Sequence, residues 1–116
     1  MKVLLVDDEK KFVSCLAERL TMRGVTADWA TTCKEALARA DAEHYDVAVL
    51  DMKMPHMSGI ELKKQLETAN PDMKFIFVTG HGSEDAYQAG TREAAFYIIK
   101  PFDIDTLLEK IKELES

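Results

Sequence analysis

The sequence has no apolar stretch long enough to cross a membrane. Its longest apolar runs, such as residues 3–6 and 47–50, are far shorter than the roughly 20 residues of a membrane-spanning helix. Met1 and Lys2 lead directly into the first run, without the apolar core and cleavage site of a secretory signal. We therefore expect a cytoplasmic protein with no membrane partner.

Cysteine and positive charge are both scarce. The two cysteines, Cys15 and Cys33, do not have the spacing of a redox or zinc motif, so we interpret them as packing residues in a reducing compartment. Fifteen Lys and Arg residues stand against 21 Asp and Glu residues, a formal net charge of -6 at pH 7. Such a surface repels nucleic acid and anionic lipid. We therefore expect no direct binding to nucleic acid.

The sequence does have enough apolar residues for one core. It has 116 residues, of which 47% are hydrophobic and 31% charged, and compact domains typically run to about 100 to 150 residues. It contains no internal repeat, low-complexity tract or linker. These features predict a single domain over residues 1–116.

Four short apolar runs are continuous rather than alternating, which is typical of parallel strands covered on both faces. They occupy residues 3–6, 47–50, 75–78 and 95–99. A fifth run, residues 25–29, alternates apolar and polar side chains and fits an edge strand with one wetter face. The sequence therefore predicts five strands.

Helical spacing and capping residues predict five helices that alternate with these strands. In the first, Phe12, Leu16 and Leu20 recur at every fourth position, and Gly24 can end the helix in a left-handed turn. The later helices are assigned from residues that can cap them, namely Thr32 with Glu35, Ser58 with Glu61, Ser83 (with Gly90 ending that helix) and Asp103. Strict alternation with short connections predicts an α/β fold, a three-layer sandwich around a doubly wound parallel sheet.

Polar residues follow most of the predicted strands. In an open α/β sheet the ligand site lies beyond the carboxyl ends of the strands. Those ends carry Asp7, Asp8 and Glu9 after residues 3–6, Asp51 after residues 47–50, Thr79 after residues 75–78, and Lys100 after residues 95–99. The predicted sheet thus brings carboxylates, a hydroxyl and an ammonium to one edge.

This group of side chains predicts a bound cation and phosphoryl chemistry. Carboxylates held together repel one another unless a cation lies between them. Oxygen ligands without histidine or cysteine favour Mg²⁺, which takes only one or two carboxylates from a protein and keeps several waters. With Lys100 as a further charge, Thr79 as a donor and Asp51 as a carboxylate nucleophile, the set suits formation of an aspartyl phosphate.

Four motifs in this order resemble those of response-regulator receiver domains of two-component signalling. They are Val6-Asp7-Asp8-Glu9, Asp51-Met52-Lys53-Met54-Pro55 with Gly59 following, Val78-Thr79-Gly80-His81-Gly82, and Lys100-Pro101-Phe102. The third is similar to the segment found in nitrogen-regulation-type transcription regulators, and the resemblance covers the whole chain. It implies a CheY-like, flavodoxin-like fold with strand order 2-1-3-4-5.

The resemblance also implies a role for each matching residue of the site. Asp51 would be the phosphoacceptor, and Lys100 would pair with the phosphoryl group. Asp8 and Asp51 would bind Mg²⁺ directly, Asp7 would act through a metal-bound water, and Lys53 would contribute its backbone carbonyl.

A switch and its partners are implied in the same way. The hydroxyl of Thr79 would move to the phosphoryl group, and the ring of Tyr97 would report the change. The partner would be a histidine kinase or a phosphotransfer protein, and a homodimer could form through the face made by the fourth helix, fifth strand and fifth helix. The sequence departs from the family before Tyr97, where Gly90 comes earlier than the usual glycine and Glu93 stands near its place.

We therefore interpret the chain as a phosphoacceptor switch rather than an enzyme, and two alternatives stay open. A magnesium-dependent phosphohydrolase with an aspartate nucleophile would carry an acid two residues after Asp51, where this sequence has Lys53. A receiver-like adaptor that signals by binding alone would have no physical need for the full set of Asp7, Asp8, Asp51, Thr79 and Lys100.

Overall fold

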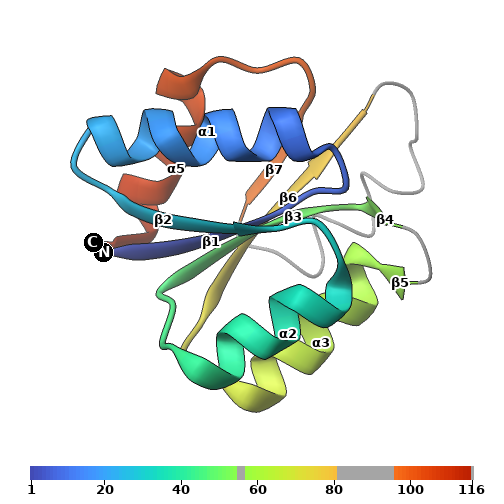
Figure 1. The fold of residues 1–116 in the computed structure, drawn as a ribbon. Helices are drawn as coiled ribbons and strands as arrows, with labels where there is room; N and C mark the ends of the chain where they lie inside the picture. The colour runs from blue at the N-terminus through green and yellow to red at the C-terminus, as the bar shows by residue number, and fades with distance from the viewer. Residues whose placement is uncertain (55–56, 81–95, 116) are drawn as a thin grey trace.

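A five-stranded parallel sheet forms the middle layer of the fold (Figure 1). The computed structural model describes residues 1–54, 57–80 and 96–115. The strands of this sheet are β1 (Lys2–Val6), β2 (Thr26–Ala30), β3 (Val47–Asp51), β6 (Lys74–Thr79) and β7 (Phe96–Ile99). They lie in the spatial order β2-β1-β3-β6-β7. Counted along the chain without the hairpin described below, this is the predicted order 2-1-3-4-5.

Helices cover both faces of the sheet (Figure 1). Those in the described residues are α1 (Lys10–Met22), α2 (Cys33–Ala42), α3 (Gly59–Ala69) and α5 (Ile104–Glu115). The structure therefore describes four helices rather than the five predicted, because the helix expected from Ser83 to Gly90 lies outside the described residues. In the part of the chain described, no helix has the length and apolar character needed to span a membrane.

Two separate cores explain why the central strands are apolar at successive positions between their ends. In β1, Val3 and Leu5 pack with α1 and α5, whereas Leu4 and Val6 pack with α2 and α3. All four side chains are at most 2% exposed, because successive residues of a strand point to opposite faces. In β7 this burial is incomplete, since Ile99 is 48% exposed at the end of an edge strand.

The helix ends follow the predicted capping residues. Gly24 has the left-handed conformation, with φ of 87°, one residue beyond the C-cap of α1. The predicted N-caps accept hydrogen bonds from the backbone N–H three residues on, namely Thr32 from Glu35 at 3.0 Å, Ser58 from Glu61 at 3.2 Å and Asp103 from Thr106 at 2.8 Å. Local sequence alone is therefore sufficient to place these helix starts.

The two cysteines and the segment after β3 differ in part from expectation. Cys33 is buried as predicted, but Cys15 is exposed on α1, so the packing role predicted for Cys15 is wrong.

After β3 the chain forms an antiparallel hairpin of β4 (Lys53–Met54) and β5 (Met57–Ser58). The sequence does not predict this hairpin, because two-residue strands are too short to show an alternating pattern.

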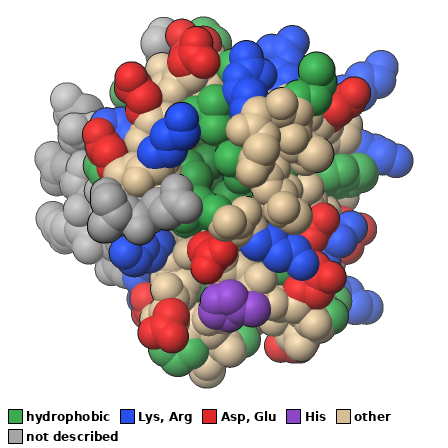
Figure 2. Space-filling view, turned by 90° about the vertical axis from the view of Figure 1, so that its left-hand side faces the viewer, with side chains coloured by type: hydrophobic (Ala, Val, Ile, Leu, Met, Phe, Trp, Pro, Cys, Tyr) green, Lys and Arg blue, Asp and Glu red, His purple; other side chains and the backbone are tan. Residues whose placement is uncertain are grey.

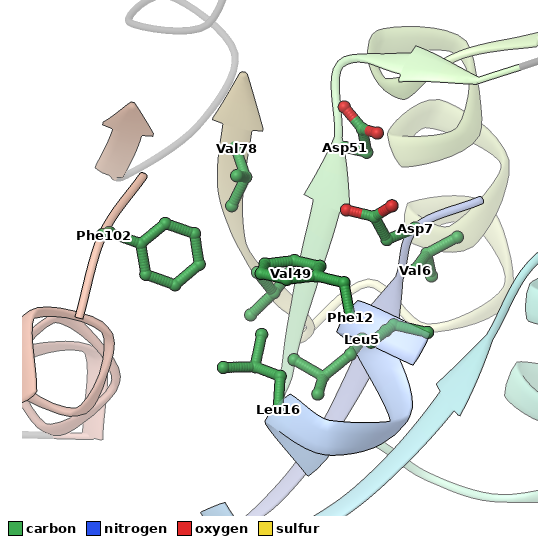
Figure 3. Close-up of a pocket in the computed structure, with 10 residues that line it drawn as sticks. Leu5, Val6, Asp7, Phe12, Leu16, Val49, Asp51, Val78 and Phe102 are labelled. Atoms are coloured by element: carbon green, nitrogen blue, oxygen red, sulfur yellow. The ribbon is translucent and has the colours of Figure 1, made fainter. Parts of the chain in front are cut away.

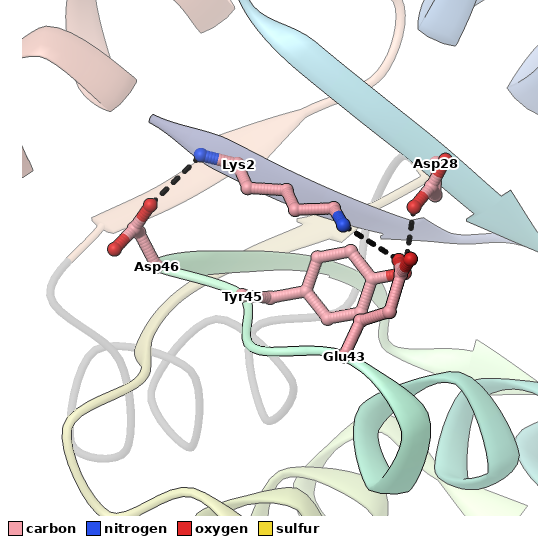
Figure 4. A network of polar contacts seen from close by, with 5 residues as sticks. All are labelled: Lys2, Asp28, Glu43, Tyr45 and Asp46. Carbon is pink, nitrogen blue, oxygen red and sulfur yellow. Dashed lines mark hydrogen bonds and ion pairs between the residues drawn. The ribbon is translucent and has the colours of Figure 1, made fainter.

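A buried tyrosine ties β2 to the amino-terminal ends of β1 and β3 (Figure 4). The Tyr45 side chain is 0% exposed, and its hydroxyl lies 2.7 Å from Asp28 Oδ2 and 3.1 Å from Glu43 Oε2. Lys2 donates from Nζ to Glu43 at 2.6 Å and from its backbone N–H to Asp46 at 2.8 Å. Burial, followed by the hydrogen bonds and charges of Asp28 and Glu43, raises the pKa of Tyr45 well above its ordinary value.

This raised pKa predicts a pH-dependent contribution to stability. Above pH 10.0, the ordinary pKa of tyrosine, the unfolded chain releases the phenolic proton before the folded chain does. The contribution of Tyr45 to the free energy of unfolding should therefore be full below this pH and decline above it. Tyr45→Phe should lower the free energy of unfolding by about 1 to 3 kcal/mol near neutral pH and remove this part of the decline. Denaturant titrations followed by Trp29 fluorescence test this, and an identical alkaline decline in both proteins would contradict it.

Candidate functional site

The carboxyl ends of four strands bring the predicted site residues together. Asp7 follows β1, Asp51 ends β3, Thr79 ends β6 and Lys100 follows β7. Asp7, Asp51 and Thr79 are buried, with 4%, 8% and 3% of each residue exposed, whereas Asp8 is exposed. The site is therefore a largely buried polar group with one acidic residue open to solvent.

Three carboxylates converge at this edge. Asp7, Asp8 and Asp51 each offer an oxygen that lies within 4.8 Å of the oxygens of the other two. Such a set of hard oxygen donors fits a divalent cation such as Mg²⁺, which commonly takes only one or two protein carboxylates and keeps waters for the rest. The predicted contribution of the Lys53 carbonyl, at the start of β4, stays a prediction.

Lys100 supplies the positive charge of the site. Its Nζ lies 2.7 Å from Asp7 Oδ2, 3.8 Å from Asp51 Oδ2 and 3.9 Å from Glu9 Oε1. Burial lowers the pKa of Lys100, but the hydrogen bond to Asp7 and the charges of Asp51, Asp7 and Glu9 outweigh it, so that the pKa is raised above its ordinary value. The ammonium therefore stays charged at neutral pH.

Backbone hydrogen bonds lie next to both buried acids. The other oxygen of Asp7, Oδ1, accepts a hydrogen bond from the Glu9 N–H at 2.9 Å. After Asp51, the Met52 N–H donates to the Val78 carbonyl at 2.9 Å, which extends the pairing of β3 with β6 past the acid. The Asp7 carboxylate is thus held by the backbone at the start of α1, and the Asp51 backbone by the sheet.

Gly59 supports Asp51 from below through direct backbone contact. A Cβ at Gly59 would lie 2.6 Å from the Asp51 carbonyl oxygen, which is closer than such atoms pack, and 3.1 Å from the Met52 Cα. The Gly59 N–H also donates to the Met52 carbonyl at 3.1 Å. Only glycine lets the first residue of α3 lie against the Asp51 peptide. The sequence motif includes Gly59 but contains no signal for this contact.

Two aromatic residues also belong to the site, although the sequence predicts no role there for either. Phe12 of α1 and Phe102 line a small cavity of about 10 Å³ that also has Asp7 and Asp51 in its wall (Figure 3). Their rings meet edge to face, with centroids 6.0 Å apart and an interplanar angle of 83°. Helical spacing marks Phe12 as a packing residue, and that spacing cannot show which polar groups its ring contacts.

The predicted switch residues lie on neighbouring strands. In the β6–β7 pairing Phe77 stands opposite Tyr97, and Thr79 opposite Ile99. Because residues two apart in a strand share a face, Thr79 and Tyr97 lie on the same face of the sheet. Tyr97 is half-buried and packs against the core under α2 and α3. The residues at 81 and 82 of the third motif, and those at 55 and 56, lie outside the described residues.

Comparisons with known proteins agree with this geometry. Over 113 residues the chain is 32% identical to the sporulation initiation phosphotransferase F of Bacillus subtilis (strain 168), covering 97% of this chain and 91% of that protein. A CheY-like receiver domain from Methanospirillum hungatei JF-1 superposes with a TM-score of 0.89 at 35% identity, covering 98% of this chain and 93% of that one. The beryllofluoride-activated NtrC4 receiver domain dimer gives a TM-score of 0.88 at 33% identity, covering 97% and 94%.

Other curated relatives are longer than this chain. The chain spans 25%, 51% and 25% of the length of the first three that it matches, so what those whole proteins do is not carried over. The model of the response regulator receiver domain matches residues 3–112, which include every site residue described above. The chain therefore belongs to the response regulator receiver domain family of two-component signalling.

Proposed function

We propose that the chain is a phosphoacceptor switch that takes a phosphoryl group onto Asp51 from the phosphohistidine of a histidine kinase or phosphotransfer protein. The observation that carries this proposal is the meeting of Asp7, Asp8 and Asp51 within 4.8 Å beside the ammonium of Lys100. Family membership supports the signalling role. The same carboxylates would hold Mg²⁺, which when bound neutralises charge on the phosphoryl oxygens.

The residues of the chain divide the chemistry between them. An Asp51 carboxylate oxygen forms a bond to phosphorus while the phosphorus–nitrogen bond of the donor breaks and the imidazole leaves. Lys100, 3.8 Å from Asp51 Oδ2, is close enough to follow the phosphoryl oxygens with a small side-chain movement. Thr79, buried at the end of the neighbouring strand β6, offers a hydroxyl donor. The product is a changed state of the chain itself rather than a released compound.

The new charge would then reach the surface through Thr79 and Tyr97. A phosphoryl group carries about -1.5 to -2 charges at neutral pH and accepts strong hydrogen bonds, so it draws the Thr79 hydroxyl toward Asp51. Tyr97, on the same face of the neighbouring strand, can turn into the space that Thr79 leaves. The surface around Tyr97 would then present a docking face for a second copy or an output partner. The dimer formed by the similar beryllofluoride-activated NtrC4 receiver domain supports this proposal.

Phosphorylation by a small donor tests the proposed chemistry. Acetyl phosphate with Mg²⁺ should add one phosphoryl group to the wild type, because the site needs no kinase to organise it, and intact-mass spectrometry measures the addition. Asp51→Asn should stay unlabelled. Asp8→Ala should label at least about tenfold more slowly, the loss typical when a metal site is disturbed. An unlabelled wild type beside a labelled reference receiver would favour the adaptor alternative, and turnover of small phosphate esters would favour the phosphohydrolase.

Beryllofluoride, which mimics the acyl phosphate, tests the proposed switch separately from hydrolysis. Its addition should change amide NMR shifts from Asp51 through Thr79 to Tyr97. Thr79→Ala should confine the changes to the neighbourhood of Asp51, because the hydroxyl that links the two strands is gone. Shifts that stay local in the wild type, or spread undiminished in Thr79→Ala, would show that the coupling is wrong.

Gly59→Ala tests how far the reaction depends on the backbone under Asp51. The added methyl group would meet the Asp51 carbonyl and should displace either α3 or the Asp51 peptide, at a stability cost of about 1 to 3 kcal/mol. Labelling by acetyl phosphate should slow even at temperatures where the variant is fully folded. Gly80→Ala is the matched control, since a Cβ at Gly80 meets no atom of the described residues within 4 Å. Equal stability and equal labelling of the two variants would contradict the close packing.

A further inference from the structure

We propose that Phe12 is a positioning residue for Lys100, and this inference rests on the proposed phosphoacceptor function and deepens it. The Lys100 Nζ lies 4.7 Å from the centroid of the Phe12 ring. The same nitrogen lies 2.7 Å from Asp7 Oδ2 and 3.8 Å from Asp51 Oδ2. The ring therefore contacts the ammonium that the proposed reaction needs beside Asp51.

The contacts of Lys100 explain why such a residue is needed. A lysine side chain is a compact charge on a flexible stem, and this one is only 20% exposed. Its short hydrogen bond goes to Asp7, while the 3.8 Å separation from Asp51 is too long for a hydrogen bond. An aromatic face attracts an ammonium over its ring. The face of Phe12 thus restrains the nitrogen so that it stays within reach of both carboxylates.

Phe12 is itself held in place by the segment that carries Lys100. Its ring meets Phe102 edge to face at 6.0 Å, and Phe102 follows Lys100 by two residues. The contact joins the first turns of α1 to the connection between β7 and α5. Phe12 thus restrains Lys100 in two ways. Its ring face contacts the ammonium, and the same ring packs edge to face with Phe102 in the segment that follows Lys100.

The two rings also separate the site from the molecular surface. Phe12, Leu16 and Phe102 line the small cavity beside Asp7 and Asp51 (Figure 3) and also line an outer groove of about 380 Å³ between α1 and α5. The ring of Phe12 therefore forms part of the wall between buried carboxylates and solvent. A wall of this kind strengthens the attraction between Lys100 and the acids, because it keeps water away from the side of the site that faces α1.

Ordinary core packing does not require an aromatic residue at this position. Leu16 and Leu20 continue the apolar face of α1 with aliphatic side chains, and a leucine at position 12 would complete that face. Unlike Leu20, which is fully buried, Phe12 is only half-buried. A leucine would lack the ring face that lies over the Lys100 ammonium. Substitutions of Phe12 that keep or remove the ring therefore distinguish a role in positioning Lys100 from a role in core packing.

The test compares Phe12→Leu, which removes the ring, with Phe12→Tyr, which keeps it. Phe12→Leu should slow labelling of Asp51 by acetyl phosphate about two- to thirtyfold, the range that corresponds to a typical cation–π contact. Phe12→Tyr should label within about twofold of the wild type. Phe96→Leu is the matched control, because it removes a ring that lies 4.8 Å from the Nζ of Lys110, outside the site, and its labelling rate should not change.

An NMR measurement reads the position of Lys100 without any phosphorylation. A ring at 4.7 Å shifts the terminal methylene protons of Lys100 to high field, and this shift should be lost in Phe12→Leu and kept in Phe12→Tyr. Methylene signals that do not move in Phe12→Leu, or labelling of that variant at the wild-type rate, would overturn the inference. An unlabelled wild type overturns instead the proposed function, and the lysine shift still decides whether the Phe12 ring lies over the end of the Lys100 side chain.

Discussion

Compensation of charge at the carboxyl edge of the sheet is the constraint on which the rest of the site depends. Asp7, Asp8 and Asp51 contribute three negative charges within 4.8 Å, and Lys100 contributes one positive charge. Like unit charges about 4 Å apart repel by roughly 4 kcal/mol at the effective dielectric of a protein surface, so bringing these carboxylates together costs free energy in the folded state. A divalent cation bound there would lower this cost, and under the proposed function the same cation and Lys100 would share the charge of an added phosphoryl group.

Backbone contacts restrain the strand ends that carry the site residues. The Met52 N–H donates to Val78, the Lys100 N–H donates to the Thr79 carbonyl, and Gly59 packs against the Asp51 peptide. These contacts extend the sheet beyond the ends of β3 and β7 and leave the main chain little room to move. Under the proposed function we therefore expect reorganisation on phosphorylation to begin in the side chains of Thr79, Lys100 and Tyr97, which can rotate without breaking these backbone hydrogen bonds.

Most of the fold and of the acidic site follows from the sequence, and the exceptions share one physical cause. Continuous apolar runs identify the central strands because two cores bury both faces, and the acids at the strand ends identify the site because parallel strands end together. The β4–β5 hairpin, the packing of Gly59 and the ring of Phe12 depend instead on how α1, α3 and the sheet approach one another in space. Lys100 and Asp7 are 93 residues apart, and their contact could be expected only because both follow strands of one sheet.

The two ends of the sheet carry different kinds of polar cluster, and the difference fits a switch. At the amino-terminal end Tyr45 is fully buried and every acid of its network has a donor, with Lys2 opposite Glu43 and Asp46 and the tyrosine hydroxyl opposite Asp28. At the carboxyl end Asp7, Asp8 and Asp51 lie together, and Asp8 is exposed. The buried network stabilises one end of β1, whereas the acids at the other end, one of them open to solvent, are accessible to an added cation or phosphoryl donor. Because β1 joins the two clusters, the buried network helps to fix the strand that carries Asp7 into the acidic site.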